Sequence, residues 1–174
     1  MDNIDISKGE YRDAKEIAKV LISSWQKAYK GYLPNSYLNR MSLKEKTKEW
    51  QKKLSNIEPK SSILIAKLNN TIIGFCNFGL SRDEDANEYT GELYNLYIVP
   101  EYMGKGIGAL LINQGLKQLK EFGFKKVTLW TSIKNEQSRK FYEKNGWINE
   151  GLIKKGLLGG FKKKGIRYIF SLND

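Results

Sequence analysis

Three glycines spaced two residues apart stand where a predicted strand gives way to a predicted helix. They are Gly104, Gly106 and Gly108, and they follow an apolar stretch that stops at Pro100. Because glycine has no Cβ, a ligand can lie directly against the backbone of such a loop. The N–H groups of the first helical turn have no partners within the helix, and they carry the positive end of its dipole. The loop therefore predicts a site for a phosphate or pyrophosphate group.

The residues available for acid and base chemistry are restricted, because the chain contains no histidine and one cysteine, Cys76. Without histidine there is no Ser-His or Cys-His nucleophilic pair and no histidine-based zinc site, and we expect no metal. Cys76 lies in an apolar run and is expected to be a packed, unreactive thiol. A general base must then be a carboxylate, a lysine, a tyrosine or a terminus.

The elements that must position this loop are predicted from the periodicity of apolar residues. Helical spacing predicts helices at residues 13–29, from 43 to about 54, at 107–122 and at 136–145. The spacings of Asp13 to Glu16 and of Ser42 to Glu45 indicate capping boxes for the first two. Strands are expected at 62–67, 71–80, 91–99, 126–132, 147–153 and 166–172, the first two forming a hairpin. This order of elements predicts one mixed α/β domain over residues 1–174.

The glycine loop by itself admits several interpretations. A P-loop is excluded, because no Gly-Lys-Ser/Thr sequence ends the loop. The run from Gly104 to Ala109 does fit the loose dinucleotide fingerprint G-x-G-x-x-G/A. That fingerprint belongs on the first βα turn, with an acidic residue at the end of the next strand, where this chain has Thr131 and Ser132. A glycine-rich loop without a ligand is a further alternative.

Two segments taken together resemble one known family. Met103-Gly-Lys-Gly-Ile-Gly108, preceded by Leu96-Tyr-Ile-Val-Pro-Glu-Tyr102, resembles the acetyl-CoA loop of the GNAT N-acetyltransferase superfamily, written Q/R-x-x-G-x-G/A. The segment from Asn135 to Trp147 is similar to that family's N-x-x-S/A-x-x-F-Y-x-x-x-G-F pattern, with Trp in place of the final Phe. The resemblance covers roughly residues 60–150. It implies an α+β fold with a mixed, mostly antiparallel central sheet, a splayed strand pair and helices on both faces.

The resemblance implies acetyl-CoA as cosubstrate and assigns its contacts. The cofactor arm would lie along the backbone of Leu96, Tyr97 and Ile98, and Asn135 would hydrogen-bond that arm, serve as a helix N-cap, or both. The first motif position is Met103, where the family usually has Gln or Arg. Because the family holds the pyrophosphate mainly by backbone amides, this Met need not abolish binding, and Lys105 or another basic residue can compensate for the missing polar side chain. The phosphates would fall on the loop, which comprises Met103, Gly104, Lys105, Gly106, Ile107, Gly108 and Ala109.

The same resemblance indicates two residues for the chemistry. Tyr142 matches the tyrosine of the second motif, which in the family reaches the cofactor sulfur, and a phenol holds its proton at pH 7 for transfer to a departing thiolate. Its alternative role is that of a core aromatic beside Phe141. Glu92 lies eleven residues before Met103, a spacing at which several family members carry a glutamate that acts as base. Its alternative is a solvated carboxylate at the end of a strand.

The acceptor of the acyl group is expected to be a primary amine of a small molecule or a peptide. In the family the acceptor site is built largely from the first helices and later loops, which points to Trp25, Tyr29 and Tyr32; core packing is the alternative. An acidic cluster at residues 83–88 is expected to be a solvated loop, or else to attract a cationic amine.

The net charge of +11 is compatible with nucleic acid, a membrane surface or an anionic small ligand. The basic stretch from Lys154 to Arg167 lacks interleaved aromatics, so we expect a solvated face and neither nucleic acid nor membrane as partner.

No apolar run is long enough to span a membrane and no signal peptide is visible, which predicts a cytoplasmic protein. A homodimer is left open. The alternatives to an N-acetyltransferase are transfer of another acyl group from CoA, or a non-catalytic CoA-binding or interaction module.

Overall fold

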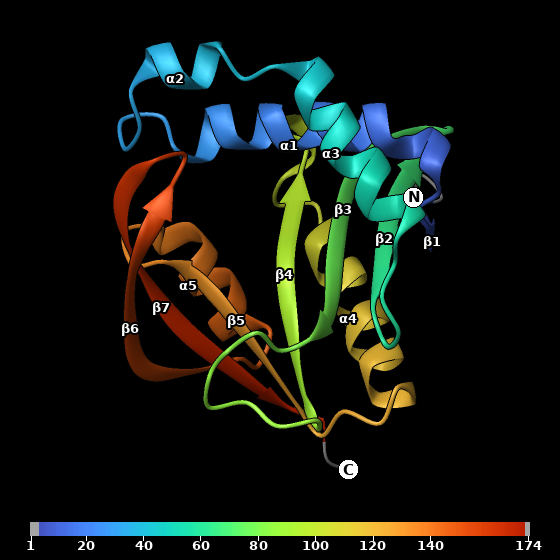
Figure 1. The fold of residues 1–174 in the computed structure, drawn as a ribbon, viewed down its shortest axis with the longest axis vertical. Helices are drawn as coiled ribbons and strands as arrows, with labels where there is room; N and C mark the ends of the chain where they lie inside the picture. Colours follow the sequence, from blue (N-terminus) through green and yellow to red (C-terminus); the bar gives the residue numbers. More distant parts are fainter. Residues whose placement is uncertain (1–3, 173–174) are drawn as a thin grey trace.

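A seven-stranded sheet forms the frame of the molecule (Figure 1). The computed structural model describes residues 4–172 of the 174-residue chain. The strands lie in the order β1-β2-β3-β4-β5-β7-β6, and all neighbours are antiparallel except β4 and β5. Their bounds are β1 Ile4–Lys8, β2 Ser62–Leu68, β3 Thr71–Leu80, β4 Thr90–Ile98, β5 Lys126–Ser132, β6 Ile148–Leu158 and β7 Phe161–Ser171.

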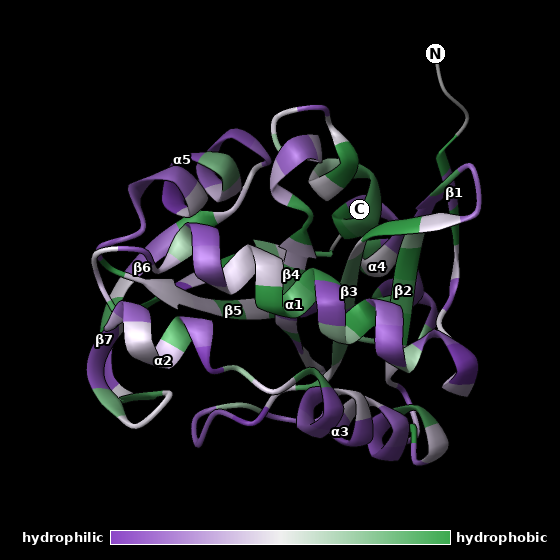
Figure 2. Cartoon of the chain, turned by 90° about the horizontal axis from the view of Figure 1, so that it is seen from above, coloured by the Kyte–Doolittle hydropathy of each residue, from purple (hydrophilic) through white to green (hydrophobic). Residues whose placement is uncertain are grey.

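Helices cover both faces of this sheet, as the view from above shows (Figure 2). On one face, α1 and α3 pack on β2 and β3 through a cluster that includes Ile17, Trp50 and Phe75. On the other, α4 and α5 cover a cluster that includes Leu111 and Tyr142. The predicted mixed, mostly antiparallel fold is confirmed. The helix bounds are α1 Ala14–Ala28, α2 Asn35–Asn39, α3 Leu43–Ser55, α4 Ile107–Glu121 and α5 Glu136–Lys144, with 3-10 turns at Tyr11–Asp13 and Pro100–Tyr102.

Cys76 belongs to the second of these clusters and is fully buried on β3. Its thiol contacts the carbonyl oxygen of Leu111 at 3.7 Å, and burial raises the pKa of the thiol far above its ordinary value. A thiol that stays protonated is a poor nucleophile. The predicted packing of this cysteine is therefore confirmed, and its low reactivity stays a prediction.

The starts of α1 and α3 show which of the two predicted helix caps form. Ser42 caps α3, because its hydroxyl accepts a hydrogen bond from the Glu45 backbone N–H at 3.2 Å. The capping box predicted for Asp13 and Glu16 is wrong. Asp13 instead forms a box with the preceding Glu10, whose backbone N–H donates to the Asp13 carboxylate at 2.9 Å. The chain enters α1 through a 3-10 turn, so the cap lies one turn earlier than predicted.

Three elements were not predicted at their observed positions. β1 adds an edge strand that pairs antiparallel with β2, and the short helix α2 stands between α1 and α3. β6 extends to Leu158 and turns at Gly159 and Gly160 into β7. Its side chains are almost all exposed, so this hairpin lacks the buried alternation from which a strand is recognised in a sequence.

The only parallel pair among the described strands separates partway along its length. β4 and β5 pair only from Thr90 to Leu93. Beyond that point β4 stays with β3 as far as Ile98, whereas β5 stays with β7 as far as Ser132. An irregularity opposite Asn77 and Phe78 offsets the β3–β4 register just where the separation begins. This is the splayed pair that the family resemblance implied.

Within residues 4–172, no helix is both long enough and apolar enough to cross a membrane.

Candidate active site

The glycine loop leaves open space where side chains would otherwise stand. Gly104 and Gly106 have φ angles of +77° and +83°, and a Cβ on either would meet no atom within 4 Å. This left-handed backbone favours glycine. Gly106 is the N-cap residue of α4 and provides no side-chain cap for the helix. The first N–H groups of α4 are thus left for an external partner, and a phosphate is the expected one.

The other loop residues have different surroundings. Gly108 lies inside the first turn of α4, where a Cβ would come within 3.1 Å of the Phe141 ring. It therefore permits close packing of α4 against α5, which corrects the expectation that all three glycines open the loop to a ligand. Met103 packs against the core beneath α4, and Lys105 Nζ lies 5.0 Å from the centre of the Tyr102 ring. Lys105 is the one cation of this loop.

Ile107 and Ala109, at the start of α4, can offer a ligand mainly their backbone groups. The Ile107 side chain is buried in the core, so its N–H is the group available to a ligand. Ala109 is partly exposed one position after Gly108. The phosphate-binding capacity of the loop therefore belongs to its main chain.

The segment predicted to bind the cofactor arm lies on the separated part of β4. Leu96 and Ile98 pack toward α4, whereas Tyr97 packs toward α1. Among the described residues, this part of β4 has no strand partner on the side of β5. Its peptide groups on that side form an open strand edge, which an extended ligand can pair with.

Asn135 and Tyr32 approach each other at one end of α5. Asn135 is the N-cap of α5, and its side-chain oxygen accepts a hydrogen bond from the Ser138 N–H at 3.0 Å. The N-cap alternative is confirmed, and the side-chain amide group remains as a donor. The Tyr32 hydroxyl donates to the carbonyl oxygen of Lys134 at 3.3 Å. The predicted acceptor residue Tyr32 thus contacts the residue that directly precedes Asn135.

Tyr142 is buried on α5 with its ring among other aromatic rings. The centres of the Phe141, Trp147 and Tyr168 rings lie 5.3, 5.9 and 6.1 Å from it. Burial raises the pKa of its hydroxyl well above 10, and the neighbouring Tyr29 acts in the same direction. The hydroxyl therefore keeps its proton at neutral pH.

The predicted acceptor residues form part of an aromatic wall on the α1 face. Trp25 and Tyr29 of the α1 end make an edge-to-face contact, with ring centres 5.1 Å apart. Burial raises the pKa of Tyr97, and the hydroxyls of Tyr29 and Tyr142 contribute in the same direction. These three phenols are therefore close enough to affect one another electrostatically, although Tyr29 follows the end of α1, Tyr97 lies on β4 and Tyr142 lies on α5. Tyr32 stands apart from them and is 55% exposed.

Glu92 is buried in the paired part of β4 and is not a solvated strand-end residue. Its carboxylate accepts hydrogen bonds from the backbone N–H, Nε and Nη2 of Arg82, at 3.0, 3.1 and 2.6 Å. Farther along the strand, the Asn95 amide donates to the side-chain oxygen of Asn77 at 2.6 Å. Neither Arg82 nor the asparagine pair was predicted. A polar Asn77 inside an otherwise apolar strand was the available signal.

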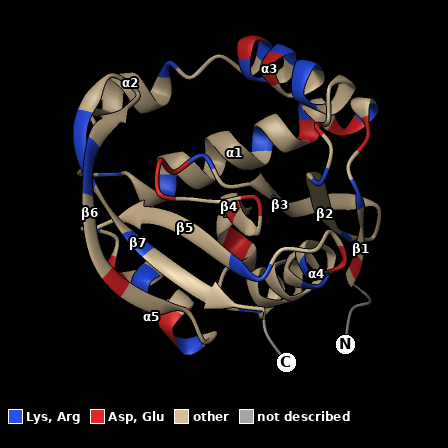
Figure 3. Cartoon of the chain, turned by 60° about the horizontal axis from the view of Figure 1, so that its bottom comes forward, with Lys and Arg blue, Asp and Glu red and all other residues tan. Residues whose placement is uncertain are grey.

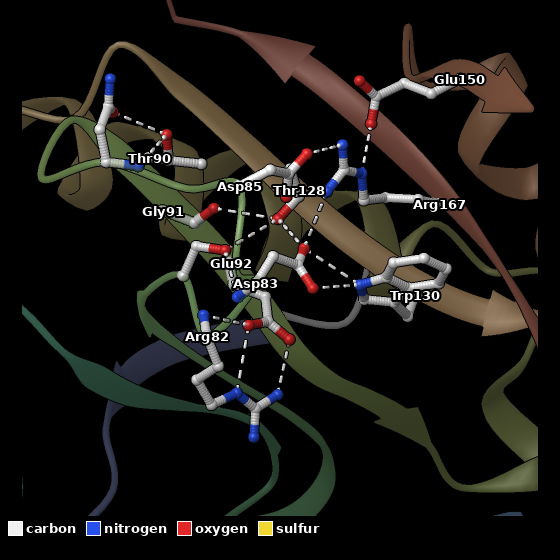
Figure 4. A network of polar contacts seen from close by, with 12 residues as sticks. Arg82, Asp83, Asp85, Thr90, Gly91, Glu92, Thr128, Trp130, Glu150 and Arg167 are labelled. Atoms are coloured by element: carbon white, nitrogen blue, oxygen red, sulfur yellow. Dashed lines mark hydrogen bonds and ion pairs between the residues drawn. The ribbon is translucent and has the colours of Figure 1, made fainter. Parts of the chain in front are cut away.

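Two of the four acidic residues of this loop, Asp83 and Asp85, are paired with other strands (Figure 4), whereas Glu84 and Glu88 are exposed as expected. Asp83 accepts a hydrogen bond from the Trp130 indole at 2.9 Å and lies 3.3 Å from the guanidinium of Arg167. Asp85 pairs with the same guanidinium at 2.7 Å, which holds the pKa of Asp85 below its usual range. Glu150 of β6 binds Arg167 at 2.6 Å. Arg167 is therefore a buried hub, which corrects its assignment to a solvated basic face.

The rest of that basic stretch matches the expectation of a solvated face. Its lysines are exposed along the hairpin of β6 and β7 (Figure 3). They are Lys154, Lys155, Lys162, Lys163 and Lys164.

Comparison with known proteins agrees with this geometry. Residues 22–147 match the family model described as the acetyltransferase (GNAT) family. An uncharacterised N-acetyltransferase of Bacillus subtilis, YuaI, is 30% identical over 140 residues, which cover 80% of this chain and 78% of that protein. A spermidine N(1)-acetyltransferase of Thermoplasma acidophilum is 29% identical over 150 residues, covering 83% and 88%.

A solved structure gives the same result at the level of the fold. The PaiA N-acetyltransferase of Thermoplasma acidophilum, in complex with coenzyme A, superposes with a TM-score of 0.72 at 25% identity. The match covers 95% of this chain and 98% of that one. The chain thus belongs to the GNAT family of acetyltransferases and is an acyltransferase.

Proposed function

We propose that this protein transfers an acetyl group from acetyl-CoA directly to a primary amine of a small molecule or a peptide, with residues 1–174 acting as one catalytic domain. The observation that carries the proposal is the separation of β4 from β5 after Leu93. It leaves an open strand edge on β4 that leads to the glycine loop, and Tyr142 is a neighbour of Tyr97 on that edge.

The residues present fit coenzyme A. Main-chain N–H groups at the start of α4 and the side chain of Lys105 would hold the phosphates. The open edge of β4 at residues 94–98 would pair with the extended arm, and the free amide group of Asn135 would add a donor. Acetyl-CoA supplies the activated acetyl thioester.

The proposed roles of Tyr142 and Glu92 follow from their different surroundings. An amine of the lysine type has a pKa near 10.4 and arrives protonated, so a base must take its proton before it can attack. Glu92 is a buried carboxylate on β4 and serves as this base. Tyr142 keeps its proton until it donates it to the departing sulfur.

The acceptor is proposed to bind the aromatic wall at Trp25 and Tyr29, together with the exposed Tyr32 that stands apart from it. Two relatives indicate which amines to test first. One is the spermidine N(1)-acetyltransferase already mentioned. The other acts on the alanine of ribosomal protein bS18 in Haemophilus influenzae, and it is 41% identical over 88 residues, half of this chain. A polyamine and a peptide with an N-terminal alanine are therefore the first candidates.

The test is release of CoA thiol from acetyl-CoA in the presence of spermidine, of an alanine-terminated peptide and of a lysine-containing peptide. We expect at least one amine to raise thiol release and to gain one acetyl group by mass spectrometry. Thiol release that is the same with and without every amine would contradict the proposal. Propionyl-CoA in parallel shows whether another acyl group is preferred.

Glu92→Gln tests the proposed base in the same assay. We expect kcat to fall by about 100-fold, because the amide cannot accept the proton. Binding of acetyl-CoA, followed as the rise in melting temperature that it causes, should be preserved. A folded Glu92→Gln variant with the kcat of the wild type would exclude Glu92 as the base.

A further inference from the structure

The carboxylate of Glu92 is hydrogen-bonded by a single neighbouring residue of the described chain (Figure 4). Within the described chain, all three hydrogen bonds that its carboxylate accepts come from Arg82, which stands in the loop between β3 and β4. The side chain of Glu92 is 5% exposed, whereas that of Arg82 is 66% exposed. A buried base is thus paired with a cation that borders water.

The two carboxylate oxygens are held in different ways. Oε2 accepts from the backbone N–H of Arg82 at 3.0 Å and from Nε at 3.1 Å. Oε1 accepts only from Nη2, at 2.6 Å, among the described residues. If the guanidinium turns into solvent, Oε2 keeps its backbone hydrogen bond and Oε1 is left without a partner. Oε1 is therefore the oxygen that can exchange one cation for another.

The backbone of Arg82 is anchored independently of its side chain. The next residue, Asp83, is buried and fixed by Trp130 and Arg167, and its own N–H donates to the Ser81 hydroxyl at 3.3 Å. The guanidinium itself rests on the Tyr94 ring, 4.1 Å from its centre. The side chain can thus leave Glu92 without displacing the loop.

We infer that the Arg82 guanidinium occupies the place on Glu92 that the acceptor's ammonium group takes, and that the acceptor displaces it. The inference rests on the proposed function. The incoming ammonium donates an N–H to Oε1, the proton passes to that oxygen, and the electron pair of the N–H bond stays on nitrogen. Arg82 is then a positioning residue, which lowers the apparent affinity for the acceptor by the fraction of molecules in which Glu92 is covered.

The test compares steady-state kinetics of Arg82→Gln with the wild type, using spermidine as the probe amine. Removing the competing cation should lower KM for spermidine about fivefold and leave kcat within about twofold. Arg82→Lys, which keeps a charge without the two-pronged contact, should lie between them. Arg12→Gln is the matched control, because it removes the cation of an exposed ion pair with Glu10 and should change neither constant. An unchanged or higher KM in folded Arg82→Gln would overturn the inference.

A double-mutant cycle separates this inference from the proposed function. In a Glu92→Gln background, Arg82→Gln should no longer change KM, because the effect passes through the carboxylate. A fivefold fall in KM that persists without the carboxylate would overturn the inference that Arg82 acts through Glu92. Failure of the proposed function gives other results: either no amine is acetylated, or Glu92→Gln keeps the kcat of the wild type.

An equilibrium measurement follows the displacement itself. In a protein labelled with ¹⁵N, the Arg82 Nε–H resonance should move toward the position of a solvated arginine as spermidine is added. The Trp130 indole resonance should stay in place, because it reports the Asp83 anchor. An Arg82 resonance that does not move, while resonances of the acceptor wall do, would overturn the inference.

Discussion

Tyr142 and Glu92 are both buried but have different neighbours. Tyr142 lies among aromatic rings, where burial disfavours the phenolate and raises its pKa. Glu92 is equally buried, but a guanidinium faces it at 2.6 Å. An apolar environment therefore surrounds the hydroxyl of Tyr142, whereas a guanidinium is ion-paired with the carboxylate of Glu92. The proposed acid and base thus differ in the groups that surround them more than in how deeply they are buried.

The variant Tyr142→Phe tests whether Tyr142 is the proposed acid. The phenylalanine keeps the ring contacts, so the variant should fold and bind acetyl-CoA with a dissociation constant within about twofold of the wild type. We expect kcat to fall by about 100-fold, because the proton donor is gone. A variant with full kcat would leave Tyr142 with a packing role alone.

The raised pKa of Tyr142 also has a consequence for the wild type. Its hydroxyl should remain protonated from about pH 8 to about pH 9.5. The kcat profile should therefore show no decline from loss of this proton in that range.

At the scale of elements, the start of α4 is a main-chain binding site built by the loop before it. Gly104 and Gly106 adopt left-handed backbone with open space beside them, and no side chain caps the helix. Gly108, two residues after Gly106, permits instead the close packing of α4 on Phe141. The loop thus combines one function in binding with one in packing, at glycines only two residues apart.

Gly104→Ala and Gly123→Ala form a matched pair that tests the binding function. Both glycines have positive φ, +77° and +90°, and a Cβ on either meets open space. Each substitution should cost about 1 kcal/mol of stability from backbone strain. Only Gly104→Ala should also raise KM for acetyl-CoA, by about tenfold, because its methyl group stands where the phosphates are proposed to bind. Equal KM values for the two variants would contradict that position.

At the scale of the whole molecule, the loop between β3 and β4 is fastened to the far end of the chain. Arg167 of β7 is buried and binds Asp83 and Asp85 of this loop and Glu150 of β6. Asp83 is next to Arg82, so the contact that covers Glu92 depends on strands that the chain reaches last. The hub therefore links the second half of the sheet to the proposed base.

Arg167→Met should lower the free energy of unfolding by about 3 kcal/mol, since it leaves the buried Asp83 carboxylate without its cation. Adding Asp83→Asn should restore part of the loss. Lys19→Gln, which breaks an exposed pair with Glu16, is the control and should change stability by less than about 0.5 kcal/mol. Urea unfolding measures all three. Wild-type stability in Arg167→Met would show that the hub does not hold the loop.

Several features could be predicted from the sequence because their causes are local. The glycine loop, the N-caps at Ser42 and Asn135, and the alternation of helices and strands depend on residues a few positions apart. The family motifs also placed Tyr142 and Glu92 on the right elements. The exposed strand β6 and the edge strand β1 were missed or cut short, since a short or solvated strand has little apolar periodicity to reveal it.

The sequence by itself therefore determined the class of the fold, the place of the glycine loop and the family, because local backbone preferences and motif order suffice for these. Tertiary structure alone decided which charges outside the helices meet. Arg167 and Asp83 are 84 residues apart in the chain and come together only through the strand order of the sheet. The partner of Glu92 is ten residues away, yet it depends on a loop that this distant contact anchors. Ion pairs such as these two depend on distance in space, and the spacing of their residues along the chain does not give that distance.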